Sequence, residues 1–65
     1  MKIKYQGKET ETDATTVAAF LVERDVKPTR TIVEVDGEIV SADAVGAMPL
    51  REGAEVNAFR VVAGG

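Results

Sequence analysis

The C-terminal end of the chain, Val61-Val62-Ala63-Gly64-Gly65, carries its most distinctive chemistry. Gly64 and Gly65 have no side chains, so the group that they offer for reaction is the terminal carboxylate of Gly65. Such a carboxylate is anionic and unreactive at neutral pH, and it has to be activated from outside, most simply by adenylation. Four extended residues reach roughly 13 Å, and glycine permits another backbone to approach closely. The sequence therefore predicts an end that enters a narrow channel in another protein.

The alternative is that these residues are an inert end, because chain termini are often small, poorly packed and without a role. Ala63, Gly64 and Gly65 carry no side chain larger than a methyl group. We expect a folded domain over residues 1–62 and a flexible tail over residues 63–65.

No conventional active site is evident in the rest of the chain. Cysteine and histidine are absent, so the most reactive nucleophile and the usual neutral-pH base are missing. The carboxylates stand at predicted turns or alternate outward on predicted strands, which is typical of a solvated face: Glu9, Glu11, Asp13, Glu34 and Glu38. The glycines form no phosphate-binding loop. The sequence therefore predicts no catalytic residue, no metal ligand and no bound cofactor, and a protein that is not an enzyme by itself.

The charge and hydropathy of the chain limit the kinds of partner that it is expected to bind. Eight Lys and Arg against eleven Asp and Glu give a net charge of −3, which disfavours a nucleic-acid partner. The charge leaves room for a partner with a positive surface, although it is also ordinary for solubility. No apolar run approaches the roughly 20 residues of a membrane span, and Met1-Lys2-Ile3 does not open a signal peptide. We expect a cytoplasmic protein that is monomeric when alone.

The first half of the chain predicts a hairpin and one helix. Residues 1–5 alternate apolar and charged side chains as a half-buried strand does, and residues 8–12 are a polar returning strand that suits a sheet edge. Asp13 or Thr15 is expected to cap a helix over residues 16–24. Val17, Phe20 and Leu21 form the apolar stripe of this helix. Pro28 is expected to prevent the helix from continuing, because the residue before a proline is disfavoured in the helical conformation.

The second half predicts three more strands. Asp36-Gly37 lies between the β-branched segments 31–35 and 38–40, as a two-residue hairpin turn requires. Residues 41–50 are irregular, with room for one helical turn over 43–47, and residues 54–62 form a last strand. One helix against one sheet is a two-layer α+β domain. We expect a β-grasp arrangement, in which a mixed sheet of four to five strands packs on one main helix and the last strand lies near the first.

The order of these elements and the closing segment LREGAEVNAFRVVAGG resemble the sulfur carriers of the ThiS/MoaD family, within the ubiquitin-like β-grasp superfamily. The resemblance covers essentially the whole chain. It implies that a ThiF- or MoeB-like activating enzyme adenylates the carboxylate of Gly65 with ATP. It further implies that a thiocarboxylate forms there and donates sulfur, in the ThiS branch to thiazole synthase (ThiG) for thiamine.

The last strand predicts a docking face. If Val56 and Ala58 turn toward the helix, Phe59 and Val61 lie on the side of the sheet that no second helix covers. Relatives in the resembled family dock through apolar residues on that face. Arg60 is a candidate for a polar contact at its rim, with a solvated arginine as the alternative. The opposite register, with Phe59 in the core, also remains open on the sequence.

Other functions share the same end of the chain. A carrier for molybdopterin, cysteine or methionine synthesis has the same requirements. A protein modifier, joined to lysines of its targets through an isopeptide bond at Gly65, also needs a free Gly-Gly end. A third class is an interaction module whose C-terminal end is inert.

Overall fold

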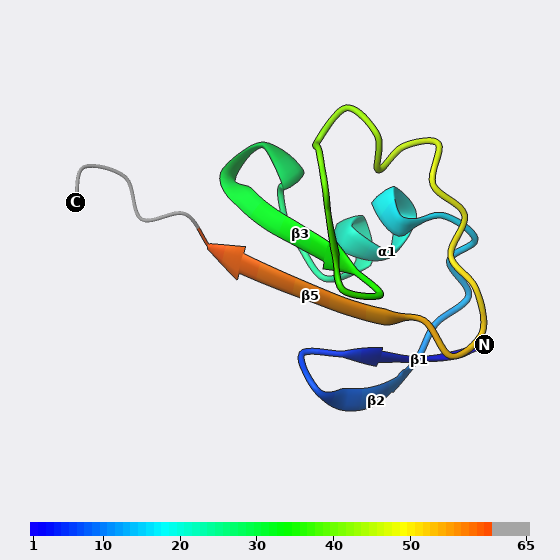
Figure 1. Ribbon diagram of the computed structural model, residues 1–65. Helices are drawn as coiled ribbons and strands as arrows, with labels where there is room; N and C mark the ends of the chain where they lie inside the picture. The colour runs from blue at the N-terminus through cyan, green and yellow to red at the C-terminus, as the bar shows by residue number, and fades with distance from the viewer. Residues whose placement is uncertain (61–65) are drawn as a thin grey trace.

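The structure, a computed structural model, describes residues 1–60, which form one sheet and one α-helix (Figure 1). The elements in chain order are β1 (Lys2–Tyr5), β2 (Lys8–Glu11), α1 (Val17–Glu23), the 3₁₀ helix η1 (Pro28–Arg30), β3 (Thr31–Val35), β4 (Glu38–Val40) and β5 (Glu55–Arg60). Among these residues, no helix combines the length and the apolar character needed to cross a membrane.

The five strands form a mixed sheet in the order β2-β1-β5-β3-β4. β5 is parallel to β1 and antiparallel to β3, so the last strand lies in the middle, beside the first. β2 occupies one edge, where its charged sequence KETE discourages a further strand from pairing. The predicted mixed sheet with one main helix is confirmed.

Both hairpins turn through two residues in the left-handed region. Gln6 and Gly7 have φ of 53° and 79°, and Asp36 and Gly37 have φ of 51° and 87°. A type I′ turn requires positive φ at both central residues, and its twist matches that of the flanking strands. The second turn fixes the register Val35↔Glu38. The hairpin predicted from Asp36-Gly37 is confirmed.

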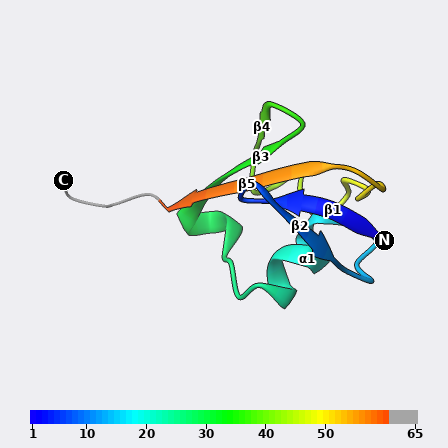
Figure 2. The ribbon, with the colours of Figure 1, turned by 90° about the horizontal axis from the view of Figure 1, so that it is seen from below.

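α1 covers only one face of the sheet, as Figure 2 shows with the helix on one side of β1 and β5. Its predicted stripe is fully buried, with Val17, Phe20 and Leu21 at 0% exposure. These side chains pack in one core with residues of three strands and of the connecting segments: Ile3, Val33, Val35 and Val56 from the strands, and Ala14, Val45, Leu50 and Ala54 from the connections.

The N-cap of α1 is Thr16, so the predicted caps Asp13 and Thr15 are wrong. The hydroxyl oxygen of Thr16 accepts a hydrogen bond from the backbone N–H of Ala19 at 3.1 Å. The N-cap is difficult to predict in residues 12–16, because four of the five residues carry a side-chain oxygen that can accept a hydrogen bond from a backbone N–H group.

The helix also ends before the proline that was expected to end it. Asp25 is left-handed, with φ of 57°, and its N–H bonds to the carbonyl of Val22 at 3.0 Å. The N–H of Val26 bonds to the carbonyl of Leu21 at 2.8 Å. Together these bonds form a Schellman motif, usually built on glycine, which turns the chain away after Glu23. Pro28 instead opens η1.

Residues 41–50 contain successive turns rather than the helical turn considered for 43–47. Val45 and Leu50 are nevertheless buried and anchor this segment in the core. The last strand begins at Glu55, and its predicted extension over residues 61 and 62 lies outside the described residues, as does the predicted tail.

Replacing Leu21 with alanine tests the core. Because the side chain is fully buried, Leu21→Ala should lower the free energy of unfolding by about 2–5 kcal/mol. That is a large part of the roughly 3–10 kcal/mol expected for a chain of this length. Chemical denaturation measures the change. The neighbouring Val22 is 77% exposed, so Val22→Ala should stay within about 0.5 kcal/mol of the unmodified chain. Equal losses in the two variants would contradict the assigned helix face.

Candidate functional site

β5 leads directly to the C-terminal residues, and hydrogen bonds hold it on both sides. β3 pairs with it along five positions, from Val35↔Val56 to Thr31↔Arg60. On the other side β1 ends at Tyr5, and the side chain of Gln6 replaces the missing backbone. Its Nε2 donates to the carbonyl of Ala58 at 2.7 Å, and the N–H of Ala58 donates to its Oε1 at 3.2 Å. The strand is therefore fixed close to the residues proposed to react.

The closing motif that carried the family resemblance has a structural explanation. Leu50 is buried, and its N–H donates to the carbonyl of Thr15 at 2.9 Å. Gly53 turns the chain at φ of 80°, which favours glycine, and its N–H donates to the carbonyl of Lys2 at 2.8 Å. Ala54, next to it, is buried. An apolar anchor, a left-handed turn and a strand thus set the starting point of β5.

The two faces of β5 differ sharply. Val56 is fully buried against the helix, whereas Phe59 is 51% exposed on the face that α1 does not cover. The prediction that Phe59 lies on the uncovered face is confirmed, and the alternative in which it is a core residue is excluded. The docking role of Phe59 stays a prediction.

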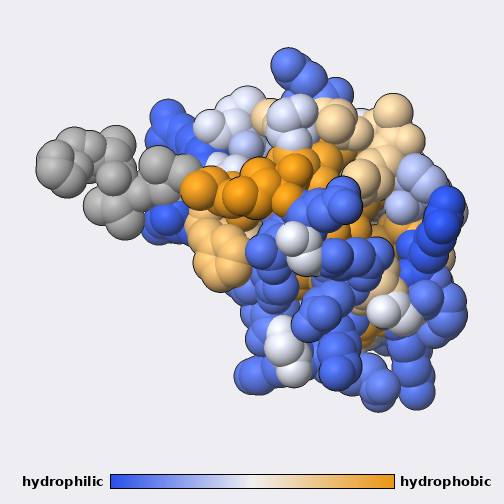
Figure 3. Space-filling model, viewed as in Figure 1, coloured by the Kyte–Doolittle hydropathy of each residue, from blue (hydrophilic) through white to orange (hydrophobic). Residues whose placement is uncertain are grey.

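Two isoleucines share this face with Phe59. Ile32 on β3 lies directly opposite Phe59 and is 43% exposed, and Ile39 on β4 is 74% exposed. We call Ile32, Ile39 and Phe59 the open-face patch. Figure 3 shows apolar surface over the β3 and β5 part of this face and hydrophilic surface over the β1–β2 hairpin. Large exposed apolar side chains gathered on one face indicate an interaction surface.

Polar groups border the open-face patch. The amide of Asn57 donates to Glu34 Oε1 at 3.1 Å across the β3–β5 pair, in the row that also holds Ile39. This bond holds two polar side chains in place beside the patch, with Glu34 next to Ile39. An apolar centre with an ordered polar border is the usual composition of a protein–protein interface.

The predicted site residues do not all come together. Arg60 projects from the opposite side of β5 to Phe59, since it lines a cavity with Ala58 on the side of α1. It therefore does not border the open-face patch, contrary to the expected rim contact. Val61, Ala63, Gly64 and Gly65 lie outside the described residues, and their roles stay predictions.

Ile32 and Ile39 are site residues that the sequence reasoning missed, although a signal was present. The turn at Asp36-Gly37 fixes Glu34 opposite Ile39. Residues two apart on a strand share a face, so Ile32, Glu34 and Ile39 belong together. Following that register from the turn would have found the patch. The buried Val33 and Val35 between them identify the other face.

The sequence profile of the ThiS family matches residues 2–65. The chain belongs to the ThiS family. Because the match covers nearly the whole chain, it includes β5, the open-face patch and the terminal Gly64-Gly65. The predicted resemblance to this family is confirmed.

Among solved structures, the crystal structure of the thiamine biosynthesis protein ThiS from Geobacter metallireducens is similar to this chain. The two are 25% identical, the alignment covers 100% of both chains, and the TM-score is 0.85. The fold is therefore the ubiquitin-like β-grasp fold of ThiS, as predicted. No curated protein sequence matches the chain.

Truncating the two phenylalanines tests the assigned faces. Phe20 is fully buried and meets the ring of Tyr5 edge-on, with centroids 5.0 Å apart, so Phe20→Ala should cost about 3–5 kcal/mol of stability. Phe59→Ala should change it by less than about 1 kcal/mol, because half of the side chain is already in water. Denaturation curves of both variants decide the matter. A Phe59→Ala variant that unfolds would place this residue in the core after all.

Proposed function

We propose that this chain is a sulfur carrier of thiamine biosynthesis whose Gly65 carboxylate is converted to a thiocarboxylate. The observation that carries the proposal is the extent of the ThiS family match, which runs to Gly65 and so includes the terminal Gly-Gly. The G. metallireducens protein, described as a thiamine biosynthesis protein, supports the same pathway. The absence of cysteine from the chain fits this chemistry, because the transferable sulfur is carried by the terminal carbon.

The proposed activation proceeds in three steps on the enzyme partner. A carboxylate oxygen of Gly65 attacks the α-phosphate of ATP, which releases pyrophosphate and leaves an acyl-adenylate. A sulfur nucleophile, such as a persulfide, then attacks the carbonyl carbon, and AMP leaves with the electron pair of the broken bond. The resulting acyl disulfide is then cleaved by a thiol, which attacks the donor's sulfur and forms a disulfide with it, and the sulfur on the carbonyl carbon leaves as the thiocarboxylate. The catalytic groups belong to a ThiF-like activating enzyme, and the carrier supplies only a terminus that can be reached and a surface that can be bound.

The open-face patch is the proposed docking surface. Aromatic and aliphatic side chains surrounded by polar groups commonly contribute most of the energy of an interface. Phe59 lies one residue before the end of β5, so a protein bound there is positioned to receive the terminus. Docking on a rigid strand also reduces the entropy lost when the terminus enters a channel.

The proposed acceptor of the sulfur is thiazole synthase, ThiG, which would use the same terminus after the activating enzyme has released it. We expect the two partners to compete for one surface, because each has to surround the same last residues. The ATP that this scheme consumes is consistent with the cytoplasmic location expected from the sequence.

The terminal carboxylate gives the first test. Deleting Gly65, or adding one residue after it, should abolish loading with sulfur, because the reacting group is removed or displaced. Intact-mass analysis after incubation with the activating enzyme, ATP and a sulfur source measures loading. Thermal unfolding should match that of the unmodified chain. Normal thiocarboxylation of an extended chain that has not been trimmed would refute the role of Gly65.

A second test concerns the penultimate glycine. Gly64→Val adds a β-branched side chain where a narrow channel has to admit backbone, and it restricts φ as well. Adenylation, followed as ATP–pyrophosphate exchange, should become severely slower. The matched control is Gly46→Val in an exposed turn, where an added Cβ meets no atom within 4 Å. Exchange at the normal rate with Gly64→Val would contradict the channel.

The docking surface gives a third test. Phe59→Ala should weaken binding to the activating enzyme by about thirtyfold or more, since an aromatic anchor contributes about 2 kcal/mol and tenfold corresponds to 1.4 kcal/mol. Val22→Ala is the control, because it removes an exposed apolar side chain from the helix on the other side of the sheet. Isothermal titration calorimetry compares them. Unchanged affinity of a folded Phe59→Ala variant would remove Phe59 from the interface.

A further inference from the structure

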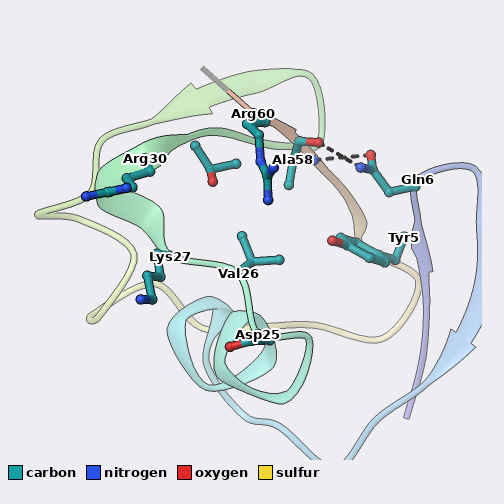
Figure 4. A pocket seen from close by; sticks show the side chains of 9 residues that line it. Tyr5, Gln6, Asp25, Val26, Lys27, Arg30, Ala58 and Arg60 are labelled. Carbon is teal, nitrogen blue, oxygen red and sulfur yellow. Dashed lines mark hydrogen bonds between the residues drawn. The ribbon is translucent and has the colours of Figure 1, made fainter. Parts of the chain in front are cut away.

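A cavity of about 600 Å³ lies beside the end of β5, on the side of the sheet opposite the open-face patch. Figure 4 shows Arg60 projecting into it toward Val26, with the hydroxyl of Tyr5 facing the same space. Ala58 lines it between them, and Lys27 stands at the rim. Neither the open-face patch nor the terminal chemistry uses these groups.

The cavity exists because the helix is shorter than the strand that it covers. α1 has seven residues and extends about 10 Å, whereas β5 has six residues and extends about 20 Å. The left-handed Asp25 turns the chain away, and η1 lines the cavity only through Arg30. The helix layer therefore stops before the end of β5 and leaves the space under Ala58 and Arg60 open.

Two walls of the cavity, Tyr5 and Ala58, are held by contacts with the rest of the domain. Tyr5 packs edge-on against Phe20 at 5.0 Å, and the guanidinium carbon of Arg24 lies 5.5 Å from the Tyr5 ring centroid. The two hydrogen bonds from Gln6 to Ala58 hold the strand above it. These two walls do not have to be ordered when a group binds, which reduces the entropy lost on binding.

The charge around the cavity is opposite to that of the chain. Lys27, Arg30 and Arg60 line it with one carboxylate, Asp25, which leaves an excess of two positive charges in a chain of net charge −3. The two ion pairs found among residues 1–60 join Met1 with Glu11 and Lys2 with Glu9. Neither pair neutralises a cation of the cavity. Guanidinium, ammonium and phenol groups around one space suit a carboxylate.

We propose that this cavity receives an acidic side chain, glutamate or aspartate, of the activating enzyme that surrounds the terminus. The inference rests on the proposed function. Arg60 immediately precedes the residues that enter the partner, and Phe59 and Arg60 point to opposite sides of β5. A partner that encloses the chain after Arg60 contacts both sides, with an apolar contact on the open-face patch and an ionic contact in the cavity.

The test compares three charge-removing variants of the full chain in binding to the ThiF-like activating enzyme. Arg60→Gln and Lys27→Gln should each raise the Kd about tenfold at low ionic strength, as loss of a charged hydrogen bond does. The difference should shrink at high ionic strength, because salt screens exposed charges. Arg51→Gln removes the same charge from the turn that precedes β5, at the opposite end of that strand from Arg60, and should leave the Kd within about twofold. All three side chains are exposed, so thermal unfolding should not change.

The outcomes separate this inference from the proposed function. If the unmodified chain is not thiocarboxylated, both fail. If it is thiocarboxylated and the Arg60 and Lys27 variants bind as tightly as the unmodified chain, the cavity assignment alone is wrong. Loss of affinity equal to that of Arg51→Gln also overturns it, since net charge then explains the effect. Titration of the isolated chain with inorganic phosphate and AMP, followed by NMR, covers a small-molecule occupant. Saturable shifts at the cavity with unchanged enzyme binding overturn the proposal.

Discussion

The placement of β5 between β1 and β3 is the constraint on which the other features depend. A parallel neighbour on one side and an antiparallel neighbour on the other place this strand in the middle of the sheet. The Gln6 side chain continues that pairing past the end of β1, to Ala58. Because the strand is held this far, the residues that follow Arg60 start from a fixed point and direction. A carrier that must deliver its end to another protein requires such a base.

Because the domain has one short α-helix among residues 1–60, both the open-face patch and the cavity beside β5 are left uncovered. One helix covers one face of the sheet, so the other face is left with Ile32, Ile39 and Phe59 in water. The same helix is too short for β5, so the covered face opens into a cavity that contains Arg60. A larger domain would bury both regions. In a chain of 65 residues they remain available to partners, on either side of the strand that leads to the terminus.

The sequence predicted those features that short-range patterns determine. The turn at Asp36-Gly37 and the stripe of α1 follow from local chemistry. Strand alternation left two registers open for Phe59, and the structure has the exposed one. The helix was predicted to within one residue at each end. Its N-cap was assigned wrongly because several oxygen-bearing residues compete for that position, and its C-terminal motif was missed because Asp25 takes a left-handed conformation that usually indicates glycine. The cavity could not be predicted, because it depends on the relative lengths and the packing of elements distant in sequence.

The central claim is that a rigid strand presents the Gly65 carboxylate for conversion to a thiocarboxylate. Mass spectrometry of the chain after incubation with its activating enzyme, ATP and a sulfur donor tests this claim most directly, with fragmentation to locate the modification. The account predicts replacement of one oxygen by sulfur, confined to Gly65 and dependent on ATP. A chain that stays unmodified, or one whose Gly65 is joined to lysines of other proteins instead, would contradict it.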